Sequence, residues 1–261
     1  MIRVRSACCT SVIENRMGEG IQGNAMLLRG RIQNLHKERC CRDFVFTASD
    51  RASMDAAAVG AGLVGLGGVA AGPGAMAMDT TEEADLLEFE LNGKPIKAWV
   101  WVSVFKEGDE VEVVAEPDSG GWMVYGIRRI SDRIVALHPH CSRGRYAHYR
   151  ASFLWFLRIV GCLILATYLI VAAVSYFSGD SLRDFVAFAA ALIPAMLISA
   201  AIFGAIAYRI SRKYFGFVQL AEGIFRGFGW PNVKHIDLPA LTKRSKTPGD
   251  PGALGVLYFR Y

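Results

Sequence analysis

The sequence predicts an α+β membrane protein, with a small antiparallel β-barrel followed by a two-helix transmembrane hairpin and a C-terminal amphipathic helix. Three observations lead to this prediction. The mean hydropathy of +0.28 is high for a soluble domain. Residues 151–208 carry only four charged side chains, Arg158, Asp180, Arg183 and Asp184. Between residues 26 and 140, short runs of β-type alternation are separated by turn signals.

The overall composition excludes several classes of protein. The chain has 261 residues, 52% of them hydrophobic, and a formal net charge of +5. This charge is mild, and no basic stripe is interleaved with aromatic residues, so we expect no nucleic-acid partner. The six cysteines form two adjacent pairs and two isolated residues without a CxxC motif. That pattern does not resemble a disulfide framework and fits a reducing compartment.

Residues 1–25 show neither a helical nor a strand period, and they lack the apolar core of a signal peptide. Two interpretations stay open for this segment: a disordered tail, or a start codon assigned too far upstream. Neither interpretation carries a function.

Residues 26–140 are predicted to form a cytoplasmic β-barrel domain. The Asn92-Gly93 pair between two alternating runs is the strongest short signal for a β-hairpin. The predicted strands cover residues 26–35, 43–47, 85–91, 96–105, 109–116, 122–128 and 133–138. Short strands at this spacing favour a strongly bent barrel of the OB or SH3-like kind. Such a barrel either binds a ligand or serves as structure, and the sequence does not decide between them.

An uncharged Gly/Ala-rich segment, residues 56–78, interrupts the predicted barrel. Its length would span a bilayer, but its seven glycines disfavour a stable helix. Gly68 and Gly72 have the spacing that allows membrane helices to approach closely. The segment is therefore either an apolar loop packed on the barrel, or a region that inserts into a membrane or self-associates.

Two apolar runs, residues 153–177 and 185–208, are each long enough to cross a membrane. The short link between them predicts a tight hairpin within residues 151–208, and Pro194 predicts a kink in the second helix. Seven basic residues flank the outer ends of the hairpin: Arg143, Arg145, Arg150, Arg158, Arg209, Arg212 and Lys213. The link holds only Arg183 beside two aspartates. The positive-inside rule therefore places both termini in the cytoplasm.

Residues 209–261 form the C-terminal part. Apolar residues recur at helical spacing from Tyr214 to Phe228, which predicts an amphipathic helix that lies in the membrane interface or docks on the barrel. Residues 255–261 are strand-like and strongly apolar. We expect this terminus to be packed and to add a strand to the barrel.

The reactive residue types gather just before the first apolar run, at His138, His140, Cys141 and His148. Imidazoles and a thiolate suit zinc, but the spacing matches no standard zinc site and a fourth ligand is missing. A Cys/His nucleophile pair is a second interpretation, and a basic junction against lipid head groups is a third. The P-loop, HExxH and GxSxG motifs are absent, so no catalytic or cofactor-binding residue is assigned and no cofactor is expected.

Several segments together resemble a proteobacterial family described as type VI secretion system effectors. These segments are residues 41–47, 105–109, 138–145, 229–231, 237–239 and 248–261, together with the Gly/Ala insertion and the hairpin. The resemblance covers residues 26–261 and implies association with a contractile secretion apparatus and interbacterial competition. It implies no mechanism and assigns no active-site residue.

Two functions follow as expectations. The first is a non-enzymatic effector that acts on the bacterial inner membrane, in which the hairpin inserts and the barrel recognises a target. The second is a resident immunity or accessory protein whose cytoplasmic barrel binds a partner. The expected partners are the lipid bilayer, a protein (the secretion apparatus, a cognate effector or an immunity protein) and a second copy of the chain.

Overall fold

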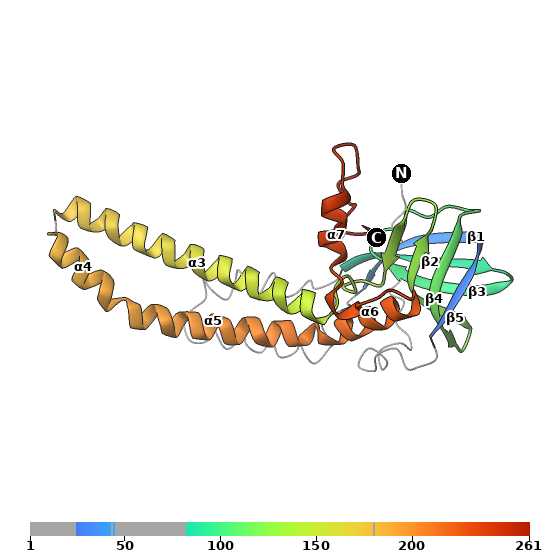
Figure 1. Ribbon diagram of the computed structural model, residues 1–261, viewed down its shortest axis with the longest axis horizontal. Coiled ribbons are helices and arrows are strands. Elements are labelled where there is room, and N and C mark those ends of the chain that lie inside the picture. The colour runs from blue at the N-terminus through green and yellow to red at the C-terminus, as the bar shows by residue number, and fades with distance from the viewer. Residues whose placement is uncertain (1–24, 43, 45–81, 180) are drawn as a thin grey trace.

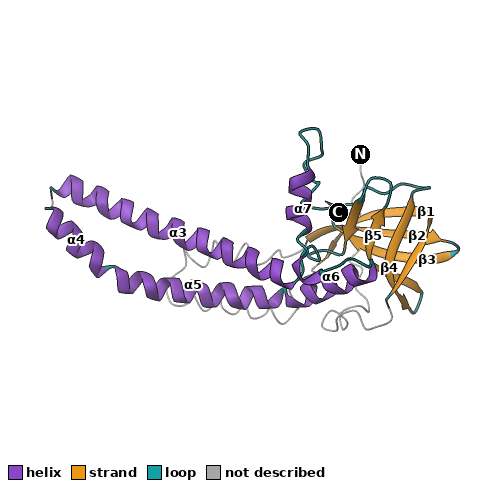
Figure 2. Ribbon diagram, in the orientation of Figure 1, coloured by secondary structure: helices purple, strands orange, loops and turns teal. Residues whose placement is uncertain are grey.

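The computed structural model describes residues 25–42, 44, 82–179 and 181–261. A β-barrel lies at one end of the molecule, and two long helices extend away from it side by side (Figure 1). Strands and helices are segregated along the long axis (Figure 2). The α+β class predicted from the sequence is confirmed.

Five strands close the barrel: β1 (Met26–Arg42), β2 (Glu82–Leu91), β3 (Lys94–Val100), β4 (Glu110–Asp118) and β5 (Gly121–Arg129). Their order is β3-β2-β1-β4-β5, and a parallel pairing between β3 and β5 completes the ring. The sheet continues beyond β5 through β6 (Ile134–Leu137) to β7 (Phe259–Arg260). The C-terminus thus adds a strand to the sheet, as the sequence predicts.

The long strand β1 closes the barrel because it serves two neighbours. Its first half pairs with β4 and its second half with β2, with a register shift between Gln33 and His36. At this bulge, the carboxylate of Glu107 accepts the backbone N–H of Asn34 (2.9 Å) and of Leu35 (2.8 Å). A bulge bends a strand and increases its twist, so β1 can curve around the barrel.

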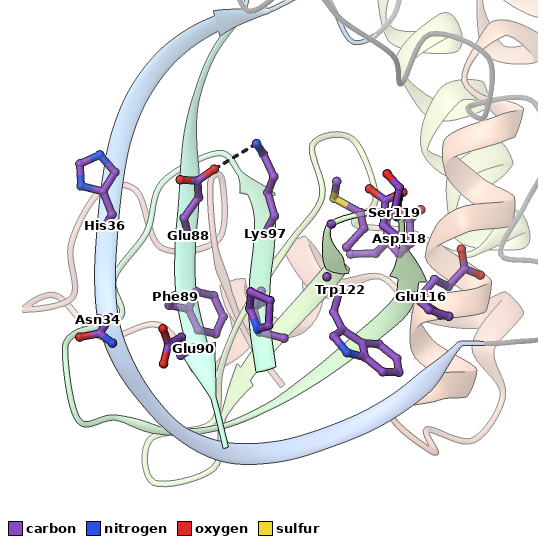
Figure 3. Close-up of a pocket in the computed structure, with 17 residues that line it drawn as sticks. Asn34, His36, Glu88, Phe89, Glu90, Lys97, Glu116, Asp118, Ser119 and Trp122 are labelled. Carbon is purple, nitrogen blue, oxygen red and sulfur yellow. Dashed lines mark hydrogen bonds and ion pairs between the residues drawn. The ribbon is translucent and has the colours of Figure 1, made fainter. Parts of the chain in front are cut away.

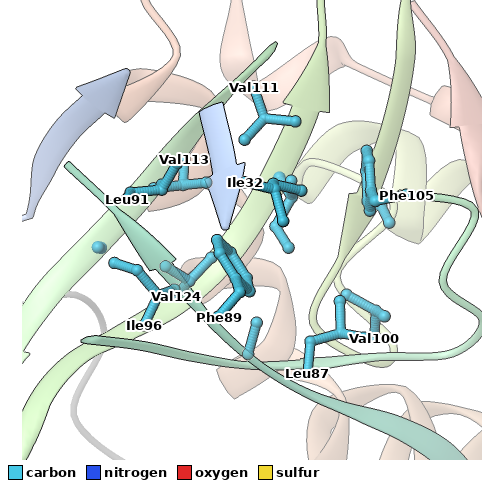
Figure 4. Close-up of a cluster of buried hydrophobic side chains, with 14 of the residues drawn as sticks. Ile32, Leu87, Phe89, Leu91, Ile96, Val100, Phe105, Val111, Val113 and Val124 are labelled. Atoms are coloured by element: carbon cyan, nitrogen blue, oxygen red, sulfur yellow. The ribbon is translucent and has the colours of Figure 1, made fainter. Parts of the chain in front are cut away.

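Alternate side chains of the strands fill the barrel interior (Figure 4). Leu87 of β2, Val113 of β4 and Val124 of β5 are almost completely buried there. Phe105, from the connection between β3 and β4, also lies in this core. The interior is therefore a packed hydrophobic core.

One predicted strand is shorter in the structure than the sequence indicates. The alternation predicts a strand over residues 96–105, but β3 ends at Val100. The buried carboxylate of Asp85 accepts the backbone N–H of Ser103 (2.7 Å) and pairs with Lys37 (2.8 Å). A buried carboxylate needs such partners, and satisfying it takes the segment after Val100 out of the ladder.

The hairpin consists of α3 (Arg145–Ser178), α4 (Leu182–Ala191) and α5 (Ile193–Lys213). The helical conformation is interrupted at Leu192, between α4 and α5. Pro194 lies in the first turn of α5, in line with the predicted kink. Residues 145–178 and 182–213 are long and apolar enough to cross a membrane. Each contains an 18-residue window of high mean hydropathy, 2.3 in the first and 2.4 in the second. Almost none of either window is buried in the protein.

A second hydrophobic core joins the helices to the barrel. The amphipathic helix α6 (Phe215–Gly227) docks on the sheet, which decides between the two predicted locations. The approach is close at Gly227, where a Cβ atom would lie 2.7 Å from Val114 of β4. The short η1 (Val233–His235) and α7 (Leu238–Ser245), which the sequence analysis does not predict, complete this end.

Three predictions fall outside the described residues. These are the nature of residues 1–24, the strand over residues 43–47, of which only Phe44 is described, and the Gly/Ala insertion 56–78 with Gly68 and Gly72. They stay predictions.

Candidate functional site

The structure divides the cluster of reactive residues between two environments. His138 and Cys141 are buried, and both belong to the layer between the barrel and α6. Burial lowers the pKa of His138 to about 4, so its imidazole is neutral at pH 7. Burial also raises the pKa of the Cys141 thiol, which keeps it protonated and a poor nucleophile. Both residues serve as core side chains.

His140 and His148 lie on the other side of the cluster, facing the helices. His140 Nε2 lies 2.8 Å from a carboxylate oxygen of Glu82, and its ring packs edge-on against Trp101. His148 Nε2 lies 2.9 Å from Ser211 Oγ on α5. Within the described residues, the structure gathers no three His, Cys, Asp or Glu side chains into a group that could hold a metal ion.

Two ionic contacts fasten the first residue of α3 and the loop before it to the C-terminal helices. The buried carboxylate of Glu222 on α6 accepts the backbone N–H of Arg145 (3.0 Å) and lies 3.5 Å from that guanidinium. Arg143 donates from Nε to Asp237 (3.2 Å), the N-cap residue of α7. The base of the hairpin is therefore held to the barrel through α6 and α7.

A cavity of about 610 Å³ lies where the hairpin meets the barrel; we call it the junction cavity. The barrel contributes Trp101, and the loop before α3 contributes His140, Ser142 and Arg143. The facing stripes of α3 and α5 form its walls. Polar residues lie near the barrel (His148, Ser152 and Ser211), where Ile210, Tyr214, Val218 and Val256 also line the cavity, and apolar residues lie further along: Phe156, Ile159, Val160, Phe203 and Ile206. The junction cavity is thus amphipathic.

A second hollow, the barrel groove, has a volume of about 940 Å³ and is lined by strands of the barrel and the turn between β4 and β5 (Figure 3). It crosses β1, β2 and β3 and ends at the turn between β4 and β5. Four carboxylates line it, Glu88, Glu90, Glu116 and Asp118, along with Trp122, Lys97 and His36. Lys97 is paired with Glu88 at 3.0 Å. The groove therefore carries a net negative charge beside an indole ring.

No family model, curated protein or solved structure matches this chain. The candidate sites are therefore assigned from the geometry and chemistry of their own residues.

The predicted topology residues all lie on the half of the hairpin nearer the barrel. Arg143 and Arg145 make the contacts described above, and Arg150 is exposed on the second turn of α3. Arg158 lies over the ring of Trp155 (5.6 Å), and Arg212 over that of Tyr208 (6.0 Å). Arg209 and Lys213 belong to the last turns of α5.

The sequence analysis missed Glu222, Ser211 and Asp237 as members of the junction. The helical spacing gives no sign that Glu222 is buried, whereas the structure leaves this side chain only 3% exposed. The helical period alone could not find these residues, because their partners lie on α3 and on the loop before it, more than 60 residues away in the chain.

Proposed function

We propose that this protein is an integral protein of the bacterial inner membrane, anchored by its helical hairpin, with the barrel at the cytoplasmic surface. One observation carries the proposal: two helices with highly apolar windows that are 6% and 0% buried within the protein. A core helix of a soluble protein would be mostly covered by its own chain. An apolar surface of this extent is unstable in water, and the hydrocarbon core of a bilayer would shield it.

The distribution of charge supports the proposed orientation. The seven basic residues named above belong to the barrel end of the hairpin, whereas Arg183 at the far turn is accompanied by Asp184. Basic residues favour the cytoplasmic side, so the barrel and both termini are assigned there.

Reporter fusions test this orientation. A reporter that is active only in the periplasm should be active when fused at Gly179, in the turn after α3, and inactive at Tyr261. Extraction of the membrane fraction with alkaline carbonate should leave the full chain in the pellet. A chain released by carbonate, or a periplasmic signal from the Tyr261 fusion, would overturn the proposal.

We further propose that the protein acts by binding a partner protein, without catalysis, as a resident component of type VI secretion. The closed five-stranded barrel fits the OB type, whose outer face often binds ligands. The acidic barrel groove suits a basic segment of a partner, because Glu90 and Asp118 offer carboxylates beside Trp122. Pull-down of the secretion-apparatus proteins by the full chain, and loss of capture by the double variant Glu90→Lys/Asp118→Lys, would test this.

The packing favours a resident protein over a secreted effector. The core that holds α6 on the barrel also fixes the base of α3, so barrel and hairpin form one unit. In the described chain nothing covers the apolar helices, which a secreted protein would have to keep soluble in transit.

An effector that acts on the membrane is the second candidate, and the shared order of motifs with the effector family favours it. Expression of the full chain in a susceptible bacterium separates the two candidates. Depolarisation of the inner membrane would support the effector. Normal membrane potential, with protection against a toxin encoded nearby, would support the resident protein.

A further inference from the structure

We propose that the junction cavity binds one anionic phospholipid, with its phosphate at Arg143 and one acyl chain between α3 and α5. This inference rests on the proposed location in the membrane, and it assigns a ligand to a site with no other assigned role.

On both helices, the residues that line the cavity change from polar near the barrel to apolar further from it. At the barrel end, His148 of α3 contacts Ser211 of α5. Further along, Phe156 of α3 lies beside Gly204 of α5, where a Cβ atom would be 3.5 Å from the phenyl ring. The helices run in opposite directions, so this registration puts the polar residues of both helices at the barrel end, beside Ile210, and leaves only apolar residues further from the barrel. An amphiphile with one polar end matches this arrangement.

The depth of the cavity fits one leaflet of a bilayer. From His148 to Val160, the lining of α3 covers 12 residue steps, which corresponds to about 18 Å at about 1.5 Å per residue. Half of a hydrocarbon core is about 15 Å thick. Ile159 and Ile206 remain about half exposed, so the apolar part of the cavity is open at the side. A lipid can therefore enter from the surrounding bilayer.

The charge at the polar end suits a phosphate. Among the described residues that line the cavity there is no Asp or Glu, while Arg143 contributes a permanent positive charge. Its hydrogen bond to Asp237 uses Nε, and its side chain is 36% exposed. The terminal amino groups of a guanidinium can bind two phosphate oxygens at once. Ser142 and Ser152 add hydroxyl donors, and Trp101 and Trp155 are of the type that occupies membrane interfaces.

Filling the cavity is the first test. The full chain is purified in detergent and titrated with palmitoyl-oleoyl phosphatidylglycerol, and bound lipid is counted by native mass spectrometry. Ala207→Phe places a phenyl ring in the apolar half of the cavity, because Ala207 lines it. Ala205→Phe is the matched control, since Ala205 is exposed on the same helix and does not line the cavity. We expect one lipid per chain in the wild type and in Ala205→Phe, and loss of that lipid in Ala207→Phe.

Changing the charge is the second test. We expect Arg143→Gln to weaken retention of phosphatidylglycerol about tenfold, the loss of one good charge-assisted contact. Arg150→Gln should have no effect, because Arg150 does not line the cavity. Asp237→Asn breaks the ion pair but leaves the cation, so it should retain the lipid. If Asp237→Asn lost lipid as Arg143→Gln does, the junction fold rather than a phosphate contact would explain the effect, and the proposal would be wrong.

The outcomes separate this inference from the proposed function. If carbonate releases the wild-type chain from membranes, the proposed function fails. If the chain stays in the membrane but retains no lipid, or retains it equally in Ala207→Phe and Ala205→Phe, only the lipid site fails. Displacement of the lipid by excess inorganic phosphate, or equal retention of phosphatidylcholine, would also overturn the assignment to an anionic lipid.

Discussion

Replacing the buried carboxylate of Glu222 tests how the hairpin is fastened to the barrel. Glu222 is 3% exposed, and its carboxylate accepts the first helical N–H of α3, at Arg145. The first N–H groups of a helix have no partner within the helix. In Glu222→Leu, this N–H loses its acceptor and the guanidinium of Arg145 loses its counter-charge. Glu222→Gln keeps an oxygen acceptor but removes the charge.

The size of the expected loss in unfolding free energy follows from how deeply each partner is buried. A hydrogen bond to a charged group contributes about 1.5–3 kcal/mol. Breaking a fully buried ion pair costs about 3–5 kcal/mol, but the Arg145 side chain is 38% exposed, so water compensates part of this charge. We therefore expect Glu222→Leu to lower the free energy of unfolding by about 2 kcal/mol, and Glu222→Gln by about 1 kcal/mol. At about 2–4 °C per kcal/mol, the leucine variant should unfold at a temperature about 6 °C lower.

The assay is thermal unfolding of the purified full chain in detergent, followed by near-ultraviolet circular dichroism at one scan rate. Glu83→Leu is the control, because Glu83 makes an exposed ion pair with Arg39 (3.3 Å), and such pairs contribute little. The reasoning is refuted if Glu222→Leu unfolds at or above the wild-type temperature, or if it cannot be distinguished from Glu83→Leu.

Three further predictions use the same assay or amide exchange. Gly144→Ala should destabilise the chain by about 3 kcal/mol, since its Cβ would lie 2.1 Å from the carbonyl oxygen of Val233; Gly161→Ala, with open space around it, should not destabilise. Burial lowers the pKa of His138 to about 4 from 6.5, so as pH falls from about 6.5 to 4 the unfolded chain takes up a proton that the folded chain excludes. The free energy of unfolding should fall over that window by roughly 3 kcal/mol, and a clearly smaller fall in His138→Gln identifies the group. Glu107→Ala should leave the two bulge amides of β1 without their acceptor, and their hydrogen exchange should accelerate about tenfold while the barrel core stays protected; equal rates in the wild type and the variant would contradict the assigned clamp.

Local features of the fold could be predicted well. Asn92 and Gly93 both adopt positive φ (52° and 74°), as the predicted two-residue turn between β2 and β3 requires. The helical spacing from Tyr214 to Phe228 gave α6, whose apolar face lies on the sheet. These features could be predicted because each depends on residues a few positions apart.

The candidate sites could be predicted only in part. The sequence singled out residues 138–148, but it could not indicate that Cys141 turns into the core while His140 and His148 face the junction cavity. That division depends on Glu82, Ser211 and Tyr214, which the fold brings next to the cluster. The junction cavity itself could not be predicted, since its walls come from the barrel and from two separate helices.

The sequence by itself determined most of the barrel strands, though not where β1 and β3 end, together with the two long apolar helices and the excess of basic residues at one end of the hairpin. Hydrophobic period, composition and net charge are properties of continuous stretches of sequence, so they can be determined without knowing the tertiary contacts. The tertiary structure alone decided the parallel β3–β5 closure, the burial of Glu222 and the polarity gradient of the junction cavity. Each of these depends on residues far apart in the chain, and a buried polar group such as Glu222 is stable only because a distant partner satisfies it.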